Sequence, residues 1–239
     1  MLAKIITSIE KCHFLIYRNT PFVTESSTSN ADLKNLGIKE EMIYIIPPGV
    51  NRDLFQPIEK AESPTMVYFG GMRRYKRPGE SIYLLETMIH KIKDIKLIIV
   101  GTGPQKTHLE NLVNEKKLQN SVKFTGRLDD KELAKVVASS WLNIHASITE
   151  GWGYSILEAS SAGTPTVAYN VPGVVDAIEN GINGLRVKDG DREALAEAAL
   201  EIIYDPKKWW SSSVEVANKY SWDRTAEMWD NLIHKIADG

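Results

Sequence analysis

Short apolar runs alternate with amphipathic segments along most of the chain. Runs that are apolar almost throughout are typical of strands buried on both faces of a parallel sheet. Here they are rich in Ile, Val and Tyr, and they predict strands over Pro21–Thr24, Ile43–Ile46, Met66–Phe69, Leu97–Val100, Ser121–Phe124, Trp141–Ile144, Pro165–Ala168 and Gly184–Val187.

The segments between these runs have the apolar spacing of helices. They predict helices over Leu2–Tyr17, Asn30–Leu36, Pro78–Lys91, Thr107–Leu118, Asp130–Ala138, Tyr154–Ala162 and Arg192–Ile203. Strands and helices joined by short connections predict right-handed βαβ units. From Met66 to Val187 we therefore expect one α/β, Rossmann-like domain, with a parallel sheet of six strands flanked by helices.

The segment before residue 56 differs, because its two predicted strands are too few for a stable sheet with its own core. We infer that residues 1–55 are the end of a preceding domain whose bulk is absent. Residues 56–64 are polar and rich in proline, which predicts a linker. Residues 65–220 then form the Rossmann-like domain.

Composition narrows the class of protein only a little. The chain has 239 residues, is 43% hydrophobic and 25% charged, and has a formal net charge of −2, which gives no reason to expect nucleic acid as a partner. Its single cysteine, Cys12, excludes an internal disulfide framework and fits a reducing compartment. No run reaches the length of a membrane span. We expect a cytoplasmic protein and leave a peripheral position at the membrane open.

A basic loop follows the predicted strand Met66–Phe69. Gly70 and Gly71 let the backbone approach a ligand, and Arg73, Arg74 and Lys76 supply positive charge for phosphate. Parallel sheets bind ligands beyond the carboxyl ends of their strands, which favours an anion site over a merely solvated loop.

A second glycine-containing loop, Val100–Pro104, follows the next strand. Gly101 and Gly103 resemble the start of a dinucleotide fingerprint, but the third glycine is missing and Pro104 stands in its place. The simpler interpretation is a tight turn that lines the pocket.

The segment Glu150–Glu158 carries the strongest signal. Gly151 and Gly153 expose backbone N–H groups where a helix is predicted to begin, an arrangement suited to a diphosphate. Glu158 lies about one turn inside that helix among apolar residues, where a carboxylate is costly unless hydrogen-bond donors satisfy it. Two ribose hydroxyls would do so. From spacing alone, two surface glutamates remain the alternative.

With these residues the chain resembles the retaining glycosyltransferases of group 1, which have the GT-B fold and a donor domain with two glutamates separated by seven residues. Further matches in the same order cover essentially the whole chain: Ile46–Asn51, Phe55, Val100–Pro104, Val122–Gly126, Ala162–Val167, Pro172–Gly173, Asn180–Val187 and Tyr220–Trp222. The resemblance implies that residues 221–239 form a helix that packs back toward the first domain.

The resemblance also implies roles for individual residues. Glu150 and Lys76 would be catalytic: Glu150 contacts hydroxyls of the transferred sugar, and Lys76 stabilises the departing diphosphate. Glu158 would accept hydrogen bonds from the ribose. The nucleotide base would lie near Arg127. The remaining donor-binding residues would be Gly151, Trp152, Gly153, Tyr154, Gly70, Gly71, Arg73, Arg74, Gly101 and Gly103.

The expected substrate is a nucleotide-diphosphate sugar, such as a UDP- or GDP-sugar, without a metal or other cofactor. The five histidines have no metal-ligand spacing. The acceptor could be a glycan, a lipid-linked sugar or a small molecule.

Two features depart from the family. Gly71 stands where the family usually has an arginine, and Arg73 and Arg74 are the candidates to replace its charge. The family's first domain, which holds the acceptor pocket, is represented only by its last elements. The second hypothesis is therefore a donor-binding module that needs another domain or chain. A dehydrogenase, resting on Gly101 and Gly103, and a sugar-nucleotide epimerase are weaker alternatives.

Overall fold

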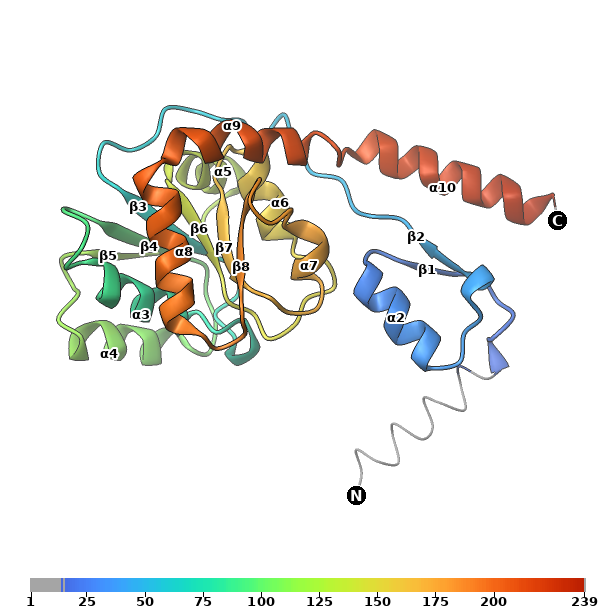
Figure 1. Cartoon of the computed structure of the whole chain (residues 1–239), viewed down its shortest axis with the longest axis horizontal. Helices are drawn as coiled ribbons and strands as arrows, with labels where there is room; N and C mark the ends of the chain where they lie inside the picture. The colour runs from blue at the N-terminus through green and yellow to red at the C-terminus, as the bar shows by residue number, and fades with distance from the viewer. Residues whose placement is uncertain (1–13, 15, 239) are drawn as a thin grey trace, which may run out of the picture.

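The computed structural model describes residue 14 and residues 16–238, so most of the helix predicted over Leu2–Tyr17 lies outside the described residues. Two sheets are present: a pair of strands near the N-terminus and a six-stranded sheet (Figure 1). The pair consists of β1 (Phe22–Thr24) and β2 (Ile43–Ile45), which run parallel and are connected through α2 (Ser27–Asn35) and the 3₁₀ turn η1 (Glu40–Met42).

All pairings in the large sheet are parallel, and the strand order is β5-β4-β3-β6-β7-β8. The strands are β3 (Thr65–Phe69), β4 (Lys96–Val100), β5 (Val122–Gly126), β6 (Leu142–His145), β7 (Thr166–Tyr169) and β8 (Gly184–Val187). This is the doubly wound order, in which strands are added on one side of β3 up to β5 and on its other side from β6 onward. The predicted sheet of six parallel strands is confirmed.

Helices cover both faces of this sheet. The helices that follow the first four strands are α3 (Gly79–Met88), α4 (Lys106–Glu115), α5 (Asp130–Ser139) and α6 (Tyr154–Ser161). The 3₁₀ turn η2 (Arg74–Lys76) precedes α3, and the later helices are α7 (Val174–Ala177), α8 (Arg192–Tyr204), α9 (Pro206–Ala217) and α10 (Trp222–Ala237).

Strand β3 shows how the two hydrophobic cores arise. All five of its residues are buried. Met66 and Tyr68 belong to the core that includes α3, α4 and α8, whereas Val67 and Phe69 belong to the core that includes α5 and α6. Because side chains alternate along a strand, burial on both faces requires the continuous apolar run seen in the sequence.

Helix α10 leaves the large sheet and lies over β1 and β2 (Figure 1). Its first turn is held by the segment that follows β2, because the hydroxyl of Thr225 donates to the carbonyl of Pro47 (3.0 Å). A Cβ on Gly49 would stand 2.3 Å from the amide nitrogen of Trp222, so only glycine fits there. The other side of α10 exposes Trp222, Trp229, Ile233 and Ile236.

None of the helices in the described part of the chain is long and apolar enough to cross a membrane.

Candidate functional site

The reversal between β3 and β6 brings two loops together at the carboxyl end of the sheet. One loop follows β3 and contains η2; the other follows β6 and leads into α6. Lys76 from the first loop forms an ion pair with Glu150 from the second, and both side chains are mostly buried. The two residues predicted to be catalytic therefore lie in contact.

The Glu150 carboxylate is held through one of its oxygens. Oε1 pairs with Lys76, accepts a hydrogen bond of 2.5 Å from the Ser147 hydroxyl, and lies 3.1 Å from Nε2 of His145. That His145 contact has ion-pair distance but not hydrogen-bond geometry. Burial alone would raise the pKa of Glu150, but His145, Lys76 and Ser147 outweigh it and lower the pKa to about 2. The group is a carboxylate at neutral pH.

The backbone of the Glu150 loop is fixed by a neighbouring turn. The amide of Glu150 donates to the carbonyl of Pro172 at 3.0 Å. Gly173 has φ +80°, and a Cβ there would stand 2.2 Å from the carbonyl oxygen of Glu150. Glycine is therefore required at Gly173 both by the conformation and by the close approach of the two backbones.

Helix α6 begins directly after this loop. Gly153 is its N-cap, with φ +98° and no side chain to cap the first turn. The first N–H groups of a helix have no partner inside the helix, and they carry partial positive charge. The start of α6 is thus suited to a phosphate group.

Glu158 lies one turn into α6 and is half-buried. Its side chain makes no ion pair or hydrogen bond with the residues that the structure describes. Burial, and next the negative charge of Asp130, raise the pKa of Glu158 to about 7. A carboxylate in such surroundings gains stability when donors arrive to satisfy it. Glu158 is a candidate ligand for hydroxyl groups.

A cavity of about 380 Å³ connects these features. The site residues predicted from sequence that line it are Gly70, Lys76, Gly101, Arg127, Glu150, Gly153, Tyr154 and Glu158. The predicted residues that are not among its lining residues are Gly71, Arg73, Arg74, Gly103, Gly151 and Trp152. His145, Ser147, Ser155 and Asp130 line it as well, although the sequence analysis did not select them.

Three of the predicted residues have structural roles. The side chain of Trp152 is buried in the core and lies edge-on to Tyr220, with ring centroids 5.3 Å apart. A Cβ on Gly101 would stand 2.0 Å from the carbonyl oxygen of Gly70, and a Cβ on Gly103 2.7 Å from that of Met72. These glycines let the loops after β3 and β4 pack backbone to backbone.

Arg77, the last cation of the basic loop, holds the two loops of the site together. Its guanidinium donates to the carbonyls of Ala146 (2.6 Å) and Ser147 (3.0 Å), and pairs with Asp189 (2.5 Å). It also lies 4.9 Å from the centre of the Tyr169 ring. Because these protein partners occupy the guanidinium, Arg77 stabilises the loops rather than offering its charge to a ligand.

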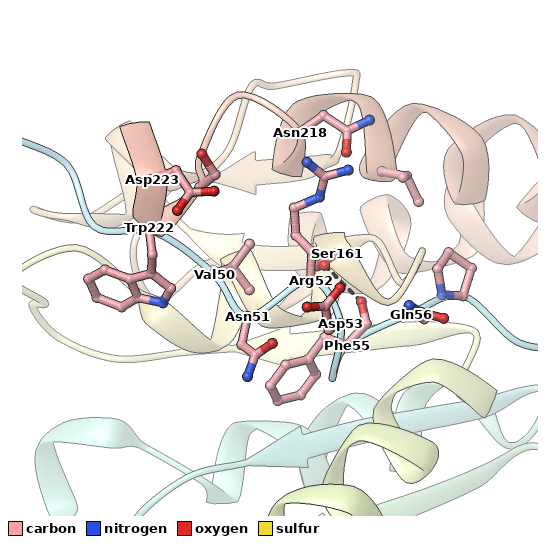
Figure 2. A pocket seen from close by; sticks show the side chains of 13 residues that line it. Val50, Asn51, Arg52, Asp53, Phe55, Gln56, Ser161, Asn218, Trp222 and Asp223 are labelled. Carbon is pink, nitrogen blue, oxygen red and sulfur yellow. Dashed lines mark hydrogen bonds between the residues drawn. The ribbon is translucent and has the colours of Figure 1, made fainter. Parts of the chain in front are cut away.

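Figure 2 shows a larger cavity, of about 550 Å³, around residues 50–57 and the junction of α9 and α10. At one side the Ser161 hydroxyl donates to the carbonyl of Phe55 at 2.7 Å. None of its lining residues comes from the loops that follow β3 to β8, where a doubly wound sheet binds its ligand. The smaller cavity, which holds the paired Lys76 and Glu150, is therefore the candidate site.

In the described part of the chain, no three His, Cys, Asp or Glu side chains are grouped in a way that could hold a metal ion.

Comparison with known proteins identifies the family of the chain. Residues 50–215 match the family described as glycosyl transferases group 1. A GDP-mannose-dependent alpha-mannosyltransferase of Corynebacterium glutamicum is 35% identical over 193 residues, which are 77% of this chain and 44% of that protein. A GDP-mannose-dependent alpha-(1-6)-phosphatidylinositol monomannoside mannosyltransferase of Mycobacterium tuberculosis is 28% identical over 211 residues, 81% of this chain and 54% of that protein.

Solved structures show the same fold. Sucrose-phosphate synthase of Thermosynechococcus elongatus superposes with a TM-score of 0.79 at 26% identity, over 90% of this chain and 58% of that one. HepE of Anabaena, solved with UDP and glucose, superposes with a TM-score of 0.80 at 19% identity, over 96% of this chain and 68% of that one.

The chain spans about half the length of the curated relatives described above. The expectation of a Rossmann-like half of a GT-B fold is confirmed by these neighbours. Since the family match covers most of the chain, the protein belongs to the group 1 glycosyl transferases.

Proposed function

We propose that the chain binds a nucleotide-diphosphate sugar in the cavity between the β3 and β6 loops and takes part in transferring the sugar with retention of its anomeric configuration. The observation that carries the proposal is the contact between Lys76 and Glu150 at the edge of the sheet where the strand order reverses. A cation for phosphate and a carboxylate for hydroxyls stand side by side there.

The donor would lie along the cavity with its diphosphate at Lys76 and the start of α6. Glu158 would accept from the ribose hydroxyls, and the base would lie near Arg127 and Leu128, which line the same cavity. Oε1 of Glu150 is taken up by protein partners, so Oε2 is the oxygen that would accept from a sugar hydroxyl. The donor thus runs from Arg127 to Glu150.

During transfer the bond between the sugar's anomeric carbon and the diphosphate breaks, and the diphosphate leaves with the electron pair. The acceptor hydroxyl forms the new bond to the anomeric carbon and gives its proton to an oxygen of the departing diphosphate. Lys76 would stabilise the charge that develops on the leaving group, and a preorganised cation in a half-buried site is effective at this. Retention is proposed because the segment Glu150–Glu158 resembles that of the retaining members of the family.

Two relatives are named as GDP-mannose-dependent, so GDP-mannose is the first donor to test, with UDP-glucose beside it. Calorimetric titration of the chain should show saturable binding of one of them, and Glu158→Ala should abolish it. If NADH binds and neither sugar nucleotide does, the proposal is wrong.

A second candidate is a donor-binding module that needs another domain for the acceptor. The exposed apolar side of α10 favours it, because Trp222, Trp229 and Ile233 are each at least 43% exposed. We propose that residues 1–55 and 221–239 pack against such a domain, with residues 56–64 as the linker. Sugar transfer or donor hydrolysis by this chain alone would contradict the module hypothesis.

A further inference from the structure

The turn that follows β1 lies against the candidate donor site. Oε1 of Glu25 accepts a hydrogen bond of 2.6 Å from the hydroxyl of Tyr154, which lines the cavity and opens α6. Oε2 of Glu25 lies 3.7 Å from the point that a Cβ on Gly151 would occupy. A carboxylate from a distant part of the sequence therefore contacts a residue that lines the cavity, although Glu25 is not itself among the lining residues.

A second contact anchors the same turn. Asp176 on α7 accepts hydrogen bonds from the amide of Ser27 (3.0 Å) and the hydroxyl of Thr28 (3.4 Å). The amide of Gly173 also donates to the Thr28 hydroxyl, at 3.4 Å. Gly173 is the residue whose backbone supports Glu150. The turn 25–28 is thus attached to the structure that positions the candidate catalytic carboxylate.

The turn is also well fixed from within. Thr24 and Ser26 are buried, and the Ser26 hydroxyl caps α2 by accepting from the amide of Ser29 at 3.1 Å. Burial and the hydrogen bond to Glu25 raise the pKa of Tyr154 to about 12, so its hydroxyl keeps the proton that it donates. The Glu25 carboxylate is therefore held in one place.

The chemistry of a carboxylate decides which part of the donor it can face. A second negative charge beside a diphosphate is repulsive, whereas the hydroxyls of a sugar are donors that a carboxylate accepts. The diphosphate is assigned to Lys76 and the start of α6. Glu25 is bonded to the side chain of Tyr154 and leaves the first amides of α6 free for the diphosphate, so its carboxylate belongs on the sugar side.

We propose that Glu25 contacts the sugar of the bound donor from beside Gly151 and Tyr154, and that Tyr154 and Asp176 are positioning residues that hold it there. This rests on the proposed function, because it assumes that the cavity takes a nucleotide sugar.

The proposal is tested by comparing the affinity for a nucleotide sugar with the affinity for the corresponding nucleoside diphosphate. Calorimetry would compare GDP with GDP-mannose, and UDP with UDP-glucose, on the whole chain. Glu25→Ala should weaken binding of the nucleotide sugar roughly three- to tenfold and leave the nucleoside diphosphate unchanged. Glu25→Gln keeps an oxygen that accepts from Tyr154, and it should restore part of the loss. Glu40→Ala, which removes a surface ion pair with Lys34 in the same segment, is the matched control.

Equal weakening of both ligands by Glu25→Ala would overturn the proposal, because it would mark a structural role only. So would no weakening of either. If the unaltered chain binds none of the four compounds, the proposed function fails and this proposal fails with it. If the chain binds these compounds but Glu25→Ala leaves the ratio of the affinities for nucleotide sugar and nucleoside diphosphate unchanged, only the role of Glu25 is overturned.

Amide hydrogen exchange tests the anchor directly. Asp176→Ala should speed exchange at Ser27 and the neighbouring amides of α2 at least several-fold, since Asp176 accepts from that amide. Adding the nucleotide sugar to the unaltered chain should slow exchange in the turn 25–28, whereas the nucleoside diphosphate should not. Unchanged exchange in Asp176→Ala would remove that residue from the proposal.

Discussion

Gly173 and Glu150 pack backbone to backbone, with 2.2 Å between the position of an added Cβ on Gly173 and the carbonyl oxygen of Glu150. This contact and the hydrogen bond from the Glu150 amide to the Pro172 carbonyl fix the backbone of Glu150. Gly173 precedes α7, so the placement of a candidate catalytic residue depends on a turn after β7.

Gly173→Ala should displace the Glu150 loop. The positive φ of Gly173 alone costs about 1–3 kcal/mol for alanine, and the clash adds to it. We expect a lower melting temperature and loss of nucleotide-sugar binding. Gly181→Ala is a matched control, because Gly181 has φ +87° but no atoms within 4 Å of an added Cβ. It should cost stability without affecting binding. If the two variants bind the ligand equally well, the backbone contact is unimportant for the site.

Lys76→Ala should weaken binding of the nucleoside diphosphate itself, roughly tenfold or more, because a charge-assisted contact to phosphate is lost. It should also raise the pKa of Glu150, since Lys76 is one of the groups that lower it. Calorimetry with GDP and UDP measures the first effect.

Arg73→Ala is the comparison for Lys76→Ala. Arg73 is exposed and does not line the cavity, so this substitution should change affinity less than twofold. A loss equal to that of Lys76→Ala would show that Arg73 supplies the charge expected where Gly71 stands.

Nucleotide binding should depend on pH through Glu158. Ribose hydroxyls donate to the carboxylate, and the pKa of Glu158 in the folded chain is about 7, so the ionised fraction rises as pH increases through 7. We expect affinity to increase up to about tenfold between pH 6 and pH 8.

Two variants check this assignment by titrations at several pH values. Glu158→Gln should remove the dependence on pH. Asp130→Asn removes the negative charge that raises the pKa of Glu158, so it should move the midpoint to lower pH. A midpoint that stays at the same pH in Asp130→Asn would assign the dependence to another group.

Lys60 should make stability depend on pH at alkaline values. Its ammonium donates to the hydroxyl of Thr164 at 2.8 Å and lies 5.5 Å from the Trp210 ring centre, and burial lowers its pKa to about 7. The unfolded chain then binds more protons than the folded chain between about pH 7 and 10.5, so stability rises with pH in that window, by at most about 1.4 kcal/mol per pH unit.

Lys60→Met should flatten that rise, as measured by urea unfolding at several pH values. The exposed Lys93 offers a control, since Lys93→Met should leave the slope unchanged. An identical slope in Lys60→Met and the unaltered chain would assign the alkaline stabilisation to other groups.

The sequence predicted the large sheet well because every one of its strands is a separate apolar run. Strand ends were less accurate: β5 was predicted to stop at Phe124 and continues to Gly126. Helix α9 was not predicted, because its stretch of Trp and Ser has weak helix propensity. Tertiary packing determines it, because Trp209 is only 1% exposed and belongs to the core that includes α3, α4 and α8.

At the site, charges near strand ends together with the family resemblance selected Lys76, Glu150 and Glu158, and the three residues line one cavity. The family resemblance implied that Trp152 contacts the ligand, and in the structure its ring is part of the core. His145 and Ser147 could not be found from spacing. Their contact with Glu150 arises only when the loop folds back on the end of β6. The individual roles in donor binding stay predictions.

The junction between residues 47–50 and α10 has a consequence for how the chain folds. Val50 pairs with Ser221, and the Thr225 hydroxyl bonds to Pro47, so this junction closes a loop that contains the entire six-stranded sheet. Contacts so distant in sequence carry a large entropic cost until the intervening domain is compact. We therefore expect α10 to dock last during folding and to detach first in local unfolding. Its amides should exchange with solvent well before those of β3, and at a denaturant concentration below that which unfolds the sheet.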